Sequence, residues 1–317
     1  MSPTSFLAGF VPGTATPTTA RAVEGILVID KPAGPTSFDV VHKLRKSLNT
    51  REIGHCGTLD PLASGVIVVC VGRYTRLVRF LTSDDKHYVA RVTFGFSTPT
   101  FDLESAADAR GDASVVTPEG LRAVLATMKG TIAQRPPMHS AIQKDGERLY
   151  AKARRGEVVE VEARAVVVNA LTLLSFERSV DPSGAHEAVA CIGAAVGKGF
   201  YVRSLARDLG AALGCPSHLS ELRRTASGAF TLDDAVTLEA SRDPALAPAL
   251  LRYGPSAIRG MTRVEIDDAT ARALRQGQRP ASTLYGTNLL ACQGEDIVAV
   301  VDVVGGVLQT VRGFGQA

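Results

Sequence analysis

The most informative stretch of this chain is residues 54–65, which read GHCGTLDPLASG. It places one carboxylate, Asp60, in a turn punctuated by Gly and Pro, and the apolar run 66–71 follows at once. A residue before proline is biased away from the right-handed helical region, so the turn is stiff where the carboxylate sits. An ionisable group on a rigid turn at the mouth of a buried strand is typical of a functional site. An ordinary Asx-type turn is the alternative interpretation.

Composition places the chain among globular proteins. Its 317 residues are 45% hydrophobic and 21% charged, with a formal net charge of +3. This length fits one large domain, or one large and one small domain. The five cysteines are odd in number, widely spaced and form no CxxC pair, so we expect no disulfide framework, no zinc site and a reducing, cytoplasmic compartment. No apolar run approaches the roughly 20 residues that span a bilayer, so we expect no membrane association.

The order of the elements follows from apolar spacing and turn residues. Residues 1–24 are rich in Pro, Thr, Ala and Gly, which predicts a disordered extension. Strands are predicted over 26–29, 65–72, 88–96 and 188–196, with two more within 158–176. Helices are predicted after Thr36 or Ser37, over 118–128 and over 200–213, and the acidic run 102–113 is predicted to be a loop. Short Val-rich strands and a helix over 267–274 predict a small β-rich module after a linker, 243–259.

A search for common catalytic patterns leaves few candidates. The sequence contains no GxxxxGK[ST] phosphate loop, no GxGxxG after a strand, no HExxH and no GxSxG. The six histidines are scattered, so no metal site is expected. What remains is one carboxylate, several arginines and a few aromatic side chains. Five cations lie within twelve residues, which is typical either of a solvated surface or of contacts with RNA phosphates: Lys144, Arg148, Lys152, Arg154 and Arg155.

Four segments, in chain order, resemble one known family. They read DKPAGPTS (30–37), GHCGTLDPLASG (54–65), RPPMHSAIQKDGERLY (135–150) and GFYVRSLARDLG (199–210), the last continuing to Leu222-Arg223-Arg224. Together they resemble the bacterial TruB family of tRNA pseudouridine synthases over about residues 25–234. The resemblance implies an α+β catalytic domain built on a mixed, largely antiparallel sheet. It also implies isomerisation of uridine 55 in the tRNA T-loop, without a cofactor or a metal.

The resemblance gives Asp60 the role of the family's essential aspartate. The reaction breaks the uridine N1–C1′ bond, turns the uracil and rejoins it to C1′ through C5. Two roles stay open for the carboxylate: nucleophile at C1′, or base and electrostatic partner of a glycal-like intermediate. Arg203 matches the arginine that pairs with this aspartate, Tyr88 the tyrosine that stacks on the base, and Leu222 an apolar wall of the uracil pocket. From pattern alone, Arg203 is an exposed helix cation, and Tyr88 and Leu222 are core residues.

Three further residues take supporting roles from the resemblance. His55 matches a histidine that supports base flipping by filling the space that the uridine leaves. A lone histidine is otherwise a solvated or core residue, so this role depends on the resemblance. Lys31 and Pro32 match a motif that supports the catalytic loop, and we expect their role to be structural.

Two regions are expected to hold RNA. The five clustered cations lie in segment 134–156, which matches the family's RNA-gripping insertion, although residue 139 is His where much of the family has a tyrosine. The C-terminal module resembles an RNA-binding PUA domain through residues 271–278, ARALRQGQ, although its strands are poor in Lys and Arg. Other cations extend the candidate RNA track: Arg73, Arg76, Arg79, Arg223 and Arg224.

These observations predict three regions. They are a disordered extension (1–24), a pseudouridine synthase domain (25–258) and a PUA-like domain (259–317). We expect a cytoplasmic monomer that binds the tRNA T-arm stem-loop and isomerises uridine 55. Two alternatives stay open: an RNA-binding tRNA-folding chaperone with secondary catalysis, and a guide-RNA-dependent ribosomal RNA pseudouridine synthase. The chain lacks the extra basic tail of such guide-dependent assemblies, which disfavours the second alternative.

Overall fold

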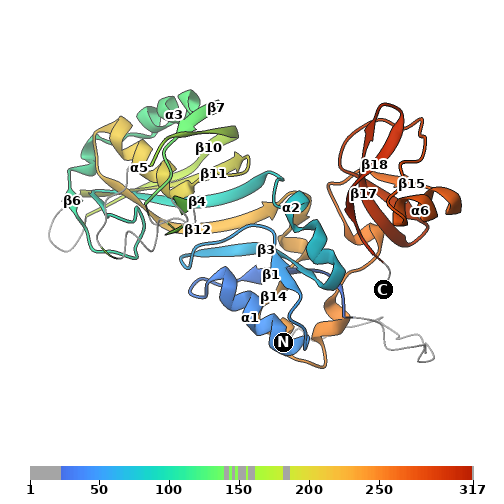
Figure 1. Cartoon of the computed structure of the whole chain (residues 1–317). Coiled ribbons are helices and arrows are strands. Elements are labelled where there is room, and N and C mark those ends of the chain that lie inside the picture. The colour runs from blue at the N-terminus through green and yellow to red at the C-terminus, as the bar shows by residue number, and fades with distance from the viewer. Residues whose placement is uncertain are drawn as a thin grey trace, which may run out of the picture.

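The protein is described here from a computed structural model, which covers residues 23–138, 143–144, 147–148, 155, 161–180 and 186–315. A ten-stranded sheet forms most of the larger body, and a four-stranded sheet lies in a C-terminal module beside it (Figure 1). The large sheet contains β1 (Gly25–Lys31), β2 (Ile53–His55), β3 (Ala63–Val71), β4 (Lys86–Phe94), β7 (Gly130–Gln134), β10 (Arg164–Val180), β11 (His186–Val196), β12 (Ser217–Ser227), β13 (Phe230–Thr231) and β14 (Val236–Thr237).

The strand order in this sheet is β14-β1-β3-β12-β4-β11-β10-β7, with β2 beside β3 and β13 beside β12. Of its described pairs, β1/β14 and β3/β12 are parallel and the others are antiparallel. The expected mixed, largely antiparallel α+β fold is therefore confirmed. Two small hairpins stand outside it: β5 (Phe96–Ser97) with β6 (Ala109–Arg110), and β8 (Gln143–Lys144) with β9 (Glu147–Arg148).

Capping residues fix the start of α1 and the end of α5. Thr36 is the N-cap of α1 (Ser37–Ser47) and forms a capping box with Asp39, which satisfies the free N–H groups of the first turn. Gly214, at φ 69°, ends α5 (Val202–Leu213) in the left-handed conformation that glycine adopts without strain. The other helices are α2 (Val78–Leu81), α3 (Pro118–Thr127) and α6 (Asp268–Arg275), and 3-10 turns are η1 (Gly72–Leu77), η2 (Ala113–Val115), η3 (Leu232–Asp234), η4 (Ala240–Arg242), η5 (Ala247–Leu250) and η6 (Pro255–Ala257).

Strand β3 is buried on both faces, which explains its nearly continuous apolar sequence. Ile67 and Val69 pack with α1 on one face, while Val66 and Val68 pack with η1, α2 and part of the C-terminal module on the other. A third core lies at the other half of the sheet, where α3 and α5 cover strands β4, β11 and β12 (Figure 1). The segment that carries Asp60 leads into the most buried strand of this arrangement.

The C-terminal module is small and β-rich, as predicted. Its strands β15 (Arg263–Glu265), β16 (Leu289–Gln293), β17 (Asp296–Val304) and β18 (Val307–Gly313) pair in chain order, with α6 against them. The rings of Tyr74 and Phe314 meet edge to face at 5.1 Å between centroids. Arg73 Nη1 donates to the Gly315 carbonyl at 2.9 Å, and Arg76 Nη1 to the Gly313 carbonyl at 3.1 Å. These contacts attach the module to the larger body.

Some predicted boundaries were wrong. Residues 158–176 were expected to form two strands, but β10 runs unbroken over 17 residues because its register shifts are absorbed by bulges. The strand predicted over 88–96 ends at Phe94, since Gly95 turns the chain at φ 124°. Glu24, placed in the predicted extension, forms an ion pair with Arg73 at 2.5 Å. Residues 1–22 and residues 149–154 lie outside the described residues.

The cysteines are free thiols, and Cys56 and Cys70 face each other in the core with their Sγ atoms 3.6 Å apart. Among the described residues, no helix is long and apolar enough to cross a membrane. In the same part of the chain, no three His, Cys, Asp or Glu side chains gather as ligands of a metal ion.

Candidate active site

The turn that carries Asp60 is fixed from the side of α1. Ser37 Oγ accepts a hydrogen bond from the Leu59 N–H at 2.8 Å and donates to the Leu59 carbonyl at 3.0 Å. On the far side of Asp60, the Gly34 N–H donates to the Pro61 carbonyl at 2.8 Å. Both neighbours of Asp60 are thus hydrogen-bonded to the start of α1 and the loop before it, and the carboxylate is held in one place.

Arg224, on β12, is hydrogen-bonded to the backbone on both sides of the same turn. Its side chain donates to the carbonyls of Val66 (2.6 Å), Gly57 (3.0 Å) and Thr58 (3.4 Å), and the residue is 1% exposed. The prediction that Arg224 extends a surface RNA track is therefore wrong. Gly65 permits the close approach of β12, because it adopts φ 102° and a Cβ there would collide with the Arg224 carbonyl oxygen.

Arg203 brings α5 to the turn. Its Nε lies 2.9 Å from Asp60 Oδ2, and its Nη1 lies 3.5 Å from Asp102 Oδ2 and 3.4 Å from the Thr100 carbonyl. The Arg203 side chain is 5% exposed, Asp102 is 1% exposed, and Asp60 is 35% exposed. The guanidinium is thus a buried bridge between one inaccessible carboxylate and one that solvent or substrate can reach. The interpretation of Arg203 as an exposed helix cation is excluded.

Asp102 is a site residue that the sequence did not single out. It lies in the acidic run 102–113, for which the sequence predicts a loop. Its Oδ1 accepts from the Glu104 N–H at 2.9 Å, so a local turn keeps the carboxylate directed inward. A buried charge requires a partner, and Arg203 is that partner here. Only the fold, which places loop 98–102 against α5, shows this.

The beginning of α5 is fixed by a buried side chain. Gln134 Nε2 donates to the Tyr201 carbonyl at 3.1 Å, and Gln134 Oε1 accepts from the Tyr201 N–H at 2.8 Å. Ser204 Oγ donates to the Arg135 carbonyl at 2.8 Å. The last residue of β7 and the residue after it thus set the position from which Arg203 reaches Asp60.

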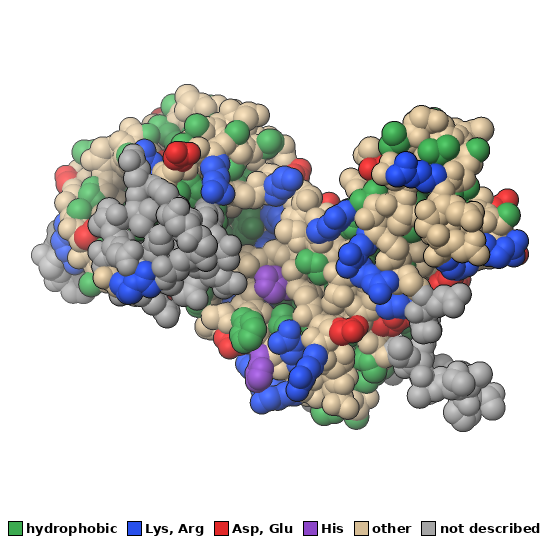
Figure 2. Space-filling model, viewed as in Figure 1, with side chains coloured by type: hydrophobic (Ala, Val, Ile, Leu, Met, Phe, Trp, Pro, Cys, Tyr) green, Lys and Arg blue, Asp and Glu red, His purple; other side chains and the backbone are tan. Residues whose placement is uncertain are grey.

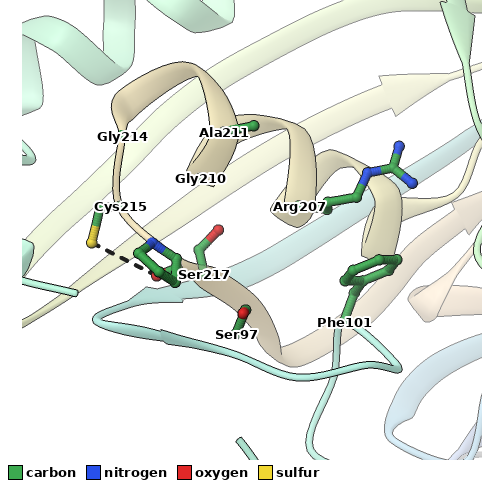
Figure 3. Close-up of a pocket in the computed structure, with 9 residues that line it drawn as sticks. Ser97, Phe101, Arg207, Gly210, Ala211, Gly214, Cys215 and Ser217 are labelled. Carbon is green, nitrogen blue, oxygen red and sulfur yellow. Dashed lines mark hydrogen bonds between the residues drawn. The ribbon is translucent and has the colours of Figure 1, made fainter. Parts of the chain in front are cut away.

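One turn further along α5, a pocket of about 330 Å³ borders the loop that binds Arg203 (Figure 3). The Arg207 guanidinium lies over the Phe101 ring, 5.3 Å from its centroid. Phe101 adopts φ 59°, a conformation that a non-glycine residue keeps only where its surroundings hold it. Since Thr100 and Asp102 flank Phe101, the Arg207 contact helps to keep both of them on Arg203.

An apolar core cluster includes Leu59, the residue before the carboxylate. Leu222 on β12 pairs with Ala90 on β4 and with Ala63 on β3, so its side chain is on the face that also carries Tyr88. These residues share one core cluster with Leu59, the neighbour of Asp60. Leu222 is 6% exposed, and Tyr88 is half-buried. The structure therefore joins Asp60 to Arg203 by an ion pair, and it places Tyr88 and Leu222 in the core cluster that contains Leu59.

His55 is the last residue of β2, precedes the turn that carries Asp60, and is half-buried. Burial, and secondly the Arg224 guanidinium, lowers the pKa of His55, so its imidazole is neutral at pH 7. A neutral ring of this kind can fill an apolar gap without bringing in a charge.

Lys31 supports the site from beneath, at the end of β1. It is fully buried, and its Nζ donates to the carbonyls of Pro32 (2.9 Å) and Pro35 (2.7 Å). Burial lowers the pKa of Lys31 to about 8, and the nearby Asp60 charge opposes this change. The two carbonyls belong to the loop whose Gly34 binds Pro61. Lys31 is therefore hydrogen-bonded to the loop that contacts the Asp60 turn.

The predicted RNA-binding cations are only partly described. Lys144 and Arg148 lie on the hairpin strands β8 and β9, but their side chains, and all of Lys152 and Arg154, lie outside the described residues. Arg155 is exposed.

Most of the other cations assigned to the RNA track have partners within the protein. Arg223 donates to both Asp30 carboxylate oxygens at 3.1 and 2.8 Å. Arg79 stacks over the Phe80 ring at 4.5 Å, and Arg73 and Arg76 bind the C-terminal end.

Comparison with known proteins identifies the class and then the family. Residues 45–202 match the family profile described as TruB family pseudouridylate synthase (N terminal domain). Residues 203–248 match the tRNA pseudouridylate synthase B C-terminal domain. The two profiles together cover residues 45–248, so the chain is a pseudouridylate synthase. The chain belongs to the TruB family.

Individual relatives agree with this assignment. The tRNA pseudouridine synthase B of Deinococcus deserti is 40% identical over 314 residues, covering 91% of this chain and 99% of that protein. The protein of the same name from Pseudomonas aeruginosa is 46% identical over 219 residues, 69% of each chain. Among solved structures, a chain in the crystal structure of a Cbf5-Nop10-Gar1 complex has a TM-score of 0.69 and 26% identity, covering 93% of this chain and 86% of that one.

Proposed function

We propose that this chain converts uridine 55 of the tRNA T-loop to pseudouridine, with Asp60 as the essential carboxylate. As a TruB-family tRNA pseudouridine synthase, it is an isomerase that makes pseudouridine in tRNA. The observation that carries the assignment of Asp60 is its ion pair with Arg203, on a fixed turn beside an apolar wall.

The site chemistry fits an isomerisation that needs no added atoms. The N1–C1′ bond breaks, the uracil turns, the C5–C1′ bond forms, and the C5 proton is replaced by one at N1. Asp60 is the accessible member of the ion pair, so it can reach C1′ while Arg203 balances its charge. Leu222 and Tyr88 line the space for the detached base and keep water away from it. Attack on C1′ and a glycal-like route both fit this geometry.

We also propose how the RNA is bound. The neutral imidazole of His55 fills the space that the flipped uridine leaves, which offsets part of the unstacking cost of a few kcal/mol. The C-terminal module (259–317) acts as a PUA-like RNA-binding domain, and residues 25–258 form the catalytic domain. The insertion grips the T-arm with its clustered cations: Lys144, Arg148, Lys152, Arg154 and Arg155. The enzyme works as a cytoplasmic monomer.

A minimal substrate tests this proposal. The purified protein is incubated with a bare T-arm stem-loop, and pseudouridine is mapped at single-nucleotide resolution. We expect conversion at position 55, and none in a matched stem-loop with cytidine at that position. Conversion that requires a guide RNA or added proteins would favour the guide-dependent alternative. Tight binding without any conversion would favour an RNA-folding role.

A further inference from the structure

Helix α1 carries a basic stripe that the active site does not use. Phe38, His42, Arg45 and Lys46 occupy positions i, i+4, i+7 and i+8, which lie on one side of a helix. Arg51 follows the helix, and we call these five residues the α1 face. Figure 2 shows Lys and Arg side chains gathered over α1 at the lower edge of the molecule. A depression of about 600 Å³ runs along this region, lined by His42, Arg45, Lys46, Asn49, Thr50 and Arg51.

The charge of the α1 face is not balanced within the described chain. Arg45, Lys46 and Arg51 form no ion pair or side-chain hydrogen bond with any residue that the structure covers. Some exposed arginines elsewhere are paired, for example Arg122 with Glu119 at 3.6 Å and Arg242 with Glu239 at 2.9 Å. The neighbouring carboxylate Asp39 is engaged in the capping box of α1, and Glu52 is the other acid in this segment. The face therefore attracts a polyanion.

The α1 face begins at the active site, and its far end is connected to His55 through β2. At the start of α1, Ser37 is hydrogen-bonded to Leu59, the residue before Asp60. Beyond Arg51, the chain enters β2, which ends at His55. The helix between them has 11 residues and is about 16 Å long. A strand of RNA leaving the site along this helix would meet the cations in succession.

An aromatic pair marks the end of the face nearest to Asp60. Phe38 is 64% exposed, and its ring is stacked with His42 at 6.5 Å between centroids, with 21° between the planes. Exposed aromatic rings among cations are what single-stranded RNA binds, because its bases stack on them.

We propose that the α1 face binds the sugar-phosphate backbone of the substrate RNA next to the target nucleotide. Lys46 and Arg51 contact phosphates, and Phe38 stacks with an unpaired base. This proposal extends the proposed function and rests on it, since the RNA is the tRNA that the site modifies.

The salt dependence of tRNA binding tests the phosphate contacts. The logarithm of the tRNA association constant falls linearly with the logarithm of the salt concentration. Removing one phosphate contact makes this negative slope shallower by about 0.7 to 0.9. The double variant Lys46→Gln/Arg51→Gln is therefore expected to reduce the slope by about 1.4 to 1.8. At 0.1 M salt its tRNA binding weakens roughly 25- to 60-fold, and the difference disappears towards 1 M. Phe38→Ala is expected to weaken binding at least about fivefold at every salt concentration, because stacking releases no counterions.

The control is Arg122→Gln/Arg242→Gln, which removes two exposed, already paired cations and leaves the same net charge. If the salt-dependence slope of the Lys46/Arg51 variant equals that of the control, the proposed phosphate contacts are wrong. If Phe38→Ala binds tRNA as tightly as the wild type, the proposed stacking contact is wrong. Wild-type conversion of the same tRNA is measured in parallel. Absence of pseudouridine there counts against the proposed function, whereas normal conversion with an unchanged slope counts against the α1 face alone.

Discussion

Replacing Asp102 by Asn removes the buried ion pair of Arg203 and leaves its ion pair with the accessible Asp60 in place. Asn keeps the shape of the side chain and its acceptor for the Glu104 N–H, but removes the charge 3.5 Å from Arg203. Breaking a buried pair costs about 3–5 kcal/mol. Arg203 retains its ion pair with Asp60 at 2.9 Å in this variant. We therefore expect a loss at the lower end of that range, about 3 kcal/mol in the free energy of unfolding. That corresponds to a fall in Tm of roughly 6–12 °C for a domain of this size.

The same variant is expected to slow the chemistry more than the binding. With one anchor gone, the Arg203 guanidinium can shift, and misplacement by about 1 Å costs on the order of 100-fold in rate. Single-turnover conversion of tRNA measures this, while tRNA affinity should stay within about threefold. The matched control is Asp108→Asn, at an exposed carboxylate that accepts from Ser97 Oγ. An Asp102→Asn enzyme with wild-type rate and wild-type Tm would refute the bridging role.

Three further predictions concern the support of the turn. Gly65→Ala should lower Tm by several degrees in thermal unfolding, since its Cβ would collide with the Arg224 carbonyl; an unchanged Tm would contradict the close approach. Arg224→Met should cost about 3 kcal/mol in denaturant unfolding, because three carbonyls lose a charged donor; a loss under about 1 kcal/mol would contradict this. The pKa of Lys31 falls from 10.5 to about 8 on folding, so the unfolded chain binds more protons between these values. Wild-type stability relative to Lys31→Met should therefore rise by up to about 3 kcal/mol between pH 8 and 10.5, and a flat difference would count against it.

Helix and strand positions were largely predictable because they depend on local chemistry. The α1 capping box, the glycine after α5 and the alternation of β4 can be read from neighbouring residues. The prediction of two strands in the region of β10 was wrong, because bulges allow one strand to continue where the apolar pattern is interrupted. The C-terminal module was predictable from short Val-rich segments.

Sequence patterns predicted the site residues less well than the helices and strands. No spacing rule joins Asp60 to Arg203, since their contact depends on α5 meeting the turn before β3. Asp102 was missed because an aspartate in an acidic loop gives no sign of burial until a cation is placed against it. Arg224 was assigned to the surface, although alternation along β12 required Arg223 and Arg224 to face opposite ways. That alternation is a signal by which the buried member could have been found.

The most direct test of the account is the Asp60→Asn enzyme. Asn fills nearly the same volume on the same fixed turn, so folding and tRNA binding should persist, with affinity within about threefold of wild type. The measurement is pseudouridine at position 55 after prolonged incubation of tRNA with excess enzyme. The account predicts no product from Asp60→Asn under conditions in which the wild type completes the conversion. Measurable pseudouridine from the variant would contradict the essential role of this carboxylate.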